Sequence, residues 1–102
     1  MLQDRQIGID RAIGAELLEC LPPQWDRARL LASREKAAGL PAVSIEGPGA
    51  EEATVSQALF GHVVELFQLN DESRTQLLRI EYEYARGADG VWSFGGDYTY
   101  AD

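Results

Sequence analysis

The last twenty-six residues, Leu77 to Asp102, constrain the fold more than any other part of the chain, because their pattern predicts an antiparallel hairpin with two unlike faces. Along the first arm, apolar or aromatic residues alternate with mostly charged ones, at the period of two that a half-buried strand requires. The Asp89–Gly90 pair tolerates the positive dihedral angles of a tight hairpin and separates the two arms. The expected core side carries Leu78, Ile80, Tyr82 and Tyr84, and the expected solvent side carries Leu77, Arg79, Glu81 and Glu83.

The returning arm adds aromatic residues and one further acid to this hairpin. Gly95–Gly96 interrupts the arm and predicts either a bulge or a place of close backbone approach. Asp97 is expected beside Glu81 and Glu83, which predicts an acidic sheet face flanked by aromatic side chains. The aromatic residues of this arm are Trp92, Phe94, Tyr98 and Tyr100.

Two stretches have the apolar spacing of amphipathic helices. The first runs from about Gln3 to Leu21, with Asp10 facing water, and the following proline pair ends it. The second starts at the N-cap candidate Thr54 and runs to about Leu69. The apolar stripes are Ile9, Ala12, Ile13, Leu17, Cys20 and Leu21 in the first helix and Val55, Leu59, Val63, Leu66 and Phe67 in the second.

The segment between the helices predicts a second hairpin. Asp26 to Glu35 has the propensity for either a helix or a strand, and the preceding prolines favour the strand. Ala42 to Ile45 predicts a short strand, and Gly47 to Ala53 predicts a loop. We therefore expect residues 1–102 to form one α+β domain with two helices on one side of an antiparallel sheet of about four strands, in the order helix, strand, strand, helix, strand, strand.

The formal net charge of −8 is unevenly distributed along the chain. Met1 to Lys36 contains six acids and six bases, whereas Ala37 to Asp102 contains eleven acids and three bases and carries the whole net charge. Such a field repels nucleic acid and attracts a basic protein, although acidic surfaces also simply keep proteins soluble. We therefore expect a protein partner and no nucleic acid.

Few residues offer catalytic or metal chemistry. Cys20 and His62 are the only cysteine and histidine, so we expect no disulfide, no zinc site and no cofactor. The absence of a long apolar run predicts a cytoplasmic chain without membrane spans. Glu81, Glu83 and Asp97 could in principle act as paired carboxylates, but acids at alternate strand positions more often form a solvated or a binding face.

Short motifs stand at both ends of the chain: Ile13-Gly14, Leu17-Leu18, Leu21-Pro22 and Trp25 near the start, and Asp89-Gly90, Trp92, Phe94 and Asp97-Tyr98-Thr99-Tyr100 near the end. Together they resemble the YezG-like bacterial immunity proteins found beside polymorphic toxins. The resemblance implies a cytoplasmic antitoxin that blocks a toxin from a neighbouring cell, as in contact-dependent growth inhibition. It supplies no catalytic residue.

The leading hypothesis is a non-enzymatic immunity protein that forms a one-to-one complex with a basic toxin domain, such as a nuclease. Its carboxylates would occupy the cleft that holds phosphates. The alternative is an acidic secretion-system chaperone or adaptor, which would dimerise and hold an extended segment. The expected contact residues are Glu81, Glu83 and Asp97, with Tyr98, Tyr100, Glu51 and Glu52 as further contacts.

Overall fold

The computed structural model describes residues 2–35, 39–72 and 76–100. They form the expected α+β arrangement, but the sheet has five strands and not about four. The additional strand lies in the segment that was expected to be a loop. In chain order the elements are α1 (Leu2–Cys20), β1 (Arg27–Ser33), β2 (Ala42–Glu46), the short 3-10 helix η1 (Pro48–Ala50), β3 (Glu52–Ala53), α2 (Gln57–Glu72), β4 (Leu77–Arg86) and β5 (Trp92–Tyr100).

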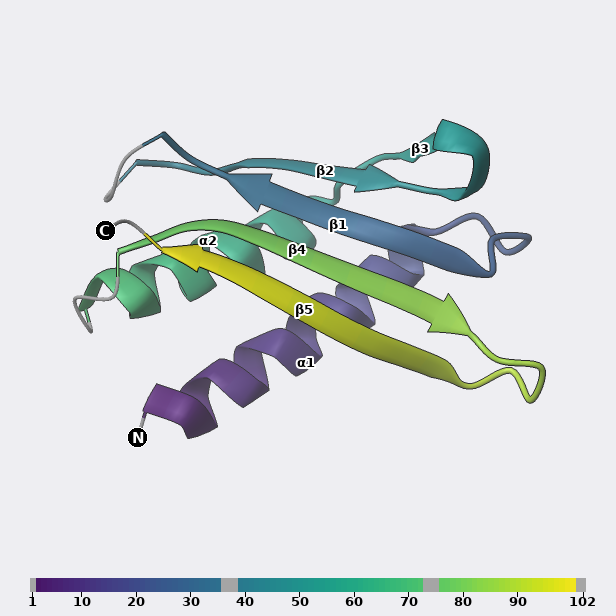
Figure 1. Cartoon of the computed structure of the whole chain (residues 1–102), viewed down its shortest axis with the longest axis horizontal. Helices are drawn as coiled ribbons and strands as arrows, with labels where there is room; N and C mark the ends of the chain where they lie inside the picture. The colour runs from purple at the N-terminus through teal and green to yellow at the C-terminus, as the bar shows by residue number, and fades with distance from the viewer. Residues whose placement is uncertain (1, 36–38, 73–75, 101–102) are drawn as a thin grey trace.

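The strands form one antiparallel sheet in the order β3-β2-β1-β4-β5, and both helices cover the same side of it (Figure 1). We call this side the helix face and the opposite side the solvent face. Asp26 to Glu35 was the ambiguous stretch, and it contains the central strand β1, whose alternating burial places Ala28, Leu30 and Ala32 on the helix face. This confirms the strand that the sequence favoured.

The helix ends follow local chemistry. α1 ends at Cys20, two residues before Pro22, as expected of the proline pair. α2 begins three residues after Thr54, and its cap is Ser56, whose Oγ accepts the backbone N–H of Leu59 at 3.1 Å. The predicted cap was therefore wrong, because β3 pairs with β2 and keeps the chain extended as far as Ala53.

The hairpin of β4 and β5 pairs as expected except at its open end. The register shifts between Leu77 and Arg79, so Leu77 turns to the helix face and is fully buried. Its predicted place on the solvent side was wrong. At Gly95–Gly96 the pairing continues without a bulge, and a Cβ on Gly96 would meet the ring of Tyr82 at 2.8 Å. Gly96 thus marks close approach, the second of the two predicted alternatives, whereas a Cβ on Gly95 would meet nothing within 4 Å.

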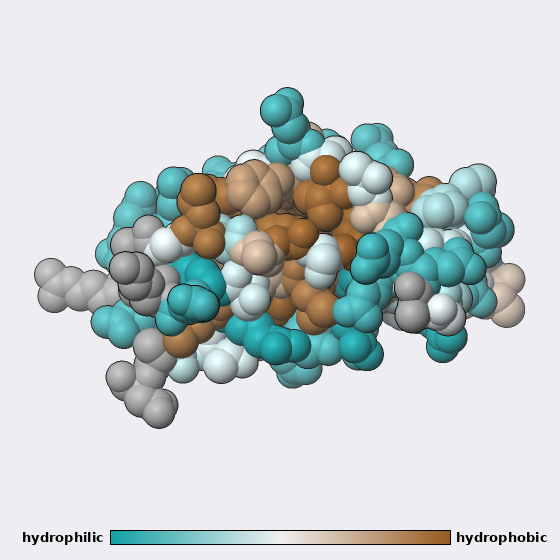
Figure 2. Space-filling model, turned by 90° about the horizontal axis from the view of Figure 1, so that it is seen from above, coloured by the Kyte–Doolittle hydropathy of each residue, from teal (hydrophilic) through white to brown (hydrophobic). Residues whose placement is uncertain are grey.

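The core lies between the helices and the helix face of the sheet. Ile13 and Leu17 of α1, Leu66 of α2 and Tyr82 of β4 are fully buried in it. Trp25, in the turn after α1, is buried at one end, whereas Cys20 is only half-buried. Figure 2 looks onto the edge formed by β2 and β3, where apolar side chains gather along the middle and hydrophilic ones surround them.

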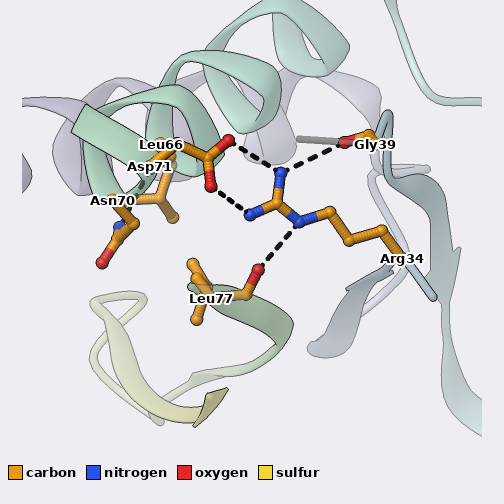
Figure 3. A network of polar contacts seen from close by, with 6 residues as sticks. All are labelled: Arg34, Gly39, Leu66, Asn70, Asp71 and Leu77. Carbon is orange, nitrogen blue, oxygen red and sulfur yellow. Dashed lines mark hydrogen bonds and ion pairs between the residues drawn. The ribbon is translucent and has the colours of Figure 1, made fainter. Parts of the chain in front are cut away.

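Arg34, directly after β1, joins three parts of the chain on the helix face (Figure 3). Its guanidinium binds both carboxylate oxygens of Asp71 in α2 at 2.6 and 3.0 Å, and it donates to the carbonyls of Leu77 at 2.8 Å and Gly39 at 3.1 Å. It also lies over the ring of Phe67, 4.7 Å from the centroid. Only 2% of the Arg34 side chain is exposed, against 28% of the Asp71 side chain, so the arginine end of this bidentate pair is buried.

Candidate functional site

The three acids expected to make the principal contacts lie together on the solvent face. Glu81 of β4 is the direct cross-strand partner of Asp97 in β5. Glu83 follows two residues after Glu81 on the same face, as the period of two requires. The expected juxtaposition of the three acids is therefore present in the structure.

Two arginines accompany these acids. The sequence placed Arg79 on the same side of the sheet, but it did not predict Arg29. Arg29 of β1 lies 3.4 Å from Glu81 and 3.4 Å from Glu83, and Arg79 lies 3.5 Å from Glu81. The side chain of Asp97, by contrast, makes no hydrogen bond or ion pair with any other residue in 2–35, 39–72 and 76–100. Two of the three acids therefore already have cationic partners within the chain.

The central position of β1 explains why Arg29, together with Arg27, lies beside these acids. The N-terminal third of the chain is electroneutral, but it supplies the strand that pairs with β4, so Arg27 and Arg29 lie among carboxylates from the later part. The solvent face consequently carries three arginines and five acids, a net −2, whereas the chain carries −8. These residues are Arg27, Arg29, Arg79, Glu46, Glu52, Glu81, Glu83 and Asp97.

The predicted tyrosine contacts lie on the other side of the sheet. Tyr98 neighbours Asp97 in β5 and therefore points to the helix face, where its hydroxyl donates to Asp10 of α1 at 3.2 Å. Tyr100 has the same parity as Tyr98 and pairs with the buried Leu77. The prediction of acids flanked by aromatic side chains was wrong, because adjacent strand residues face opposite sides.

The two loop acids of the prediction lie at the far edge of the sheet. Glu52 is in β3, and β3 and β5 are the opposite edges, so about four strand spacings, roughly 19 Å, separate Glu52 from Asp97. Glu51 accepts a hydrogen bond from the indole Nε1–H of Trp25 at 2.9 Å. The seven predicted contact residues therefore do not form one continuous surface.

The solvent face is hollowed beside Glu83. A groove of about 630 Å³ opens where the small residues Ala85, Ser93 and Gly95 leave space between longer side chains. Arg27 and Glu46 are among the residues that line it, together with Arg29 and Glu83. The groove is thus lined by charges of both signs and is wide enough to receive side chains from another molecule. The sequence did not predict it, because its lining comes from four strands.

A hydroxyl and carboxylate cluster connects α1 to the hairpin on the helix face. Tyr82 Oη donates to Asp10 at 2.5 Å, and the hydroxyls of Tyr82 and Tyr98 lie 3.1 Å apart. Burial raises the pKa of Asp10, more than the hydrogen bonds from the two tyrosines lower it. Burial, together with the hydrogen bond to Asp10, also raises the pKa of Tyr82. Asp10 was expected to face water, so this expectation was wrong.

Near this cluster lies a buried polar atom without a partner. The hydroxyl of Tyr84 has no hydrogen bond within the part of the chain that the structure describes, and burial raises its pKa. A Cβ on Gly14 of α1 would lie 3.7 Å from this hydroxyl. The helix and the hairpin therefore approach each other closely here, with no opening to solvent.

Within residues 2–35, 39–72 and 76–100, no three His, Cys, Asp or Glu side chains are placed to hold a metal ion. His62 lies half-exposed on α2, with Nδ1 3.5 Å from Glu65. None of the helices described is long and apolar enough to cross a bilayer.

No protein-family model matches this chain, and no curated protein matches it in sequence.

Proposed function

We propose that this chain is a cytoplasmic immunity protein that binds one basic toxin domain through the solvent face and neutralises it without chemistry of its own. The observation that carries the proposal is a hollowed sheet face that neither α1 nor α2 covers, with Glu81, Glu83 and Asp97 in adjacent positions. The resemblance of both chain ends to immunity proteins supports the same role.

The ion pairs on this face modify the electrostatic part of the proposal. Because Arg29 and Arg79 partly neutralise Glu81 and Glu83, these acids act at short range and exchange an internal arginine for one from the partner. Asp97 is the acid available without such an exchange. The groove beside Glu83 would receive an arginine or lysine of the toxin. If the toxin is a nuclease and this residue binds phosphate, its insertion keeps it from the nucleic acid.

The experiment uses the C-terminal domain encoded by the adjacent reading frame as the partner. Light scattering of the mixture should give a one-to-one complex, and co-expression should restore growth to cells that produce the toxin. A dimer of this chain that binds only unfolded segments would instead identify a secretion chaperone and contradict the proposal.

A charge reversal tests whether the toxin domain contacts the solvent face. Glu81→Lys with Glu83→Lys should slow association about tenfold and weaken its salt dependence. Glu16→Lys with Glu19→Lys on α1 changes the net charge by the same amount on the other side of the sheet and serves as the control. Equal association rates for both double variants would exclude the solvent face.

A further inference from the structure

The edge strand β5 has the features of a template for another strand. It runs unbroken over nine residues at one end of the sheet order, and no described strand pairs with its outer side (Figure 1). Every second residue of such an edge directs its backbone N–H and C=O away from the sheet. The opposite edge is different, because β3 has only two residues.

Of the usual devices that prevent strand addition, β5 has only a single charged side chain, that of Asp97. Its sequence, WSFGGDYTY, contains neither lysine nor proline, and the register shift of the hairpin lies at Leu77 and Arg79 and not in the middle of the strand. Gly95 leaves open space, since a Cβ there would meet nothing within 4 Å. A large side chain of an added strand therefore has room on the solvent face beside Gly95.

The two faces of β5 determine the chemistry of a strand that fits. On the helix face Phe94 is 49% exposed and Tyr100 is 44% exposed, so apolar side chains of an added strand would cover aromatic surface. On the solvent face Ser93, Gly95 and Thr99 are small and uncharged, and Asp97 supplies the charge. A complementary strand alternates apolar residues with polar or basic ones.

The position of Asp97 favours a basic residue at the neighbouring position of the added strand. Asp97 lies directly opposite Glu81, and like charges at such positions destabilise a sheet. Arg29 and Arg79 compensate Glu81, but Asp97 has no cation in the described part of the chain. The next position in this row, about 4.8 Å further out, belongs to an added strand, and a basic side chain there would relieve the repulsion.

We infer that β5 receives an extended segment of a partner protein as a sixth strand, with a basic side chain beside Asp97 and apolar side chains over Phe94 and Tyr100. A second copy of the chain fits poorly, because it would bring another Asp97 and a further net −8 to the same edge. That the segment belongs to the toxin domain rests on the proposed function. The strand addition itself rests on β5.

The probe is a ten-residue peptide of alternating arginine and valine, and its control has glutamate in place of arginine. Hydrogen exchange of the backbone amides in β5 should slow at least tenfold with the basic peptide and stay unchanged with the acidic one. Asp97→Lys should weaken binding of the basic peptide at least tenfold. Glu19→Lys, the same charge change on an exposed position of α1, should alter it less than twofold.

Several outcomes overturn the inference. Unchanged exchange in β5 or equal effects of both peptides would each do so. So would a free chain that is a dimer by light scattering and whose outward-facing β5 amides are already protected from exchange. If the toxin domain binds while exchange in β5 stays unchanged, the strand addition is wrong and the proposed function stands. If the basic peptide protects β5 but the toxin domain does not bind, the proposed function fails and the strand addition stands.

Discussion

Each face of the sheet carries an arginine paired with carboxylates, but the two arginines differ in burial and in how they are bonded. On the helix face, the Arg34 side chain is 2% exposed and binds Asp71 through two hydrogen bonds. On the solvent face, the Arg29 side chain is 46% exposed and forms one ion pair with each of two glutamates. A buried arginine that donates four hydrogen bonds to three segments fixes the positions of the elements around it. An exposed arginine is available to exchange its partner. The helix face thus maintains the fold, and the solvent face is available for binding.

The largest expected effect comes from breaking the buried pair. Arg34→Met leaves Asp71 and the carbonyl of Leu77 without their donor and should cost about 3–5 kcal/mol of unfolding free energy in a urea titration. The double variant Arg34→Met with Asp71→Leu removes both charges and should recover part of this loss. If the double variant is no more stable than the single one, an uncompensated charge is not the cause.

The adjacent residues Gly95 and Gly96 of β5 allow the two faces to be compared by the same substitution at neighbouring positions. Gly96→Ala directs a methyl group into the buried ring of Tyr82 and should lower the unfolding free energy by about 1–3 kcal/mol. Gly95→Ala directs the same methyl group into open space and should leave stability equal or raise it by up to about 1 kcal/mol. Similar losses in both variants would mean that backbone freedom, and not contact with Tyr82, requires the glycines.

The half-buried Asp10 should give the helix face a pH dependence. Its pKa is raised in the folded state, so its contribution to stability is fully present below the unfolded value near 3.8 and is lost as the pH rises through the folded value. Asp10→Asn keeps an acceptor for Tyr82 and lacks this titration. Urea midpoints measured from pH 3 to pH 7 should therefore fall with rising pH relative to those of Asp10→Asn. Parallel curves for the two proteins would contradict the assignment.

The smallest effect is expected on the solvent face. Arg29→Gln removes two exposed ion pairs and should lower the unfolding free energy by less than about 1 kcal/mol. The difference should disappear in about 1 M salt, where the screening length is near 3 Å. A loss as large as that of Arg34→Met would mean that both faces stabilise the fold equally.

Local patterns predicted the elements well, because period and turn chemistry depend on neighbouring residues. The alternation in β4, the proline pair after α1 and the strand character of β1 all agree with the structure. The candidate site was predicted only in part. The pairing of Glu81 with Asp97 follows from the hairpin turn, whereas β3, the cap at Ser56 and the buried Asp10 depend on contacts between distant segments.

The sequence by itself determined the class of fold, the hairpin register beside the Asp89–Gly90 turn and the total charge, since these depend on local spacing and on composition. Only the tertiary structure decided which charged side chains lie close to one another in space. The arginines of β1 become neighbours of the acids of β4 only because β1 lies at the centre of the sheet. Electrostatic interactions depend on distance in space, and the uneven charge along the chain is therefore largely evened out on the solvent face.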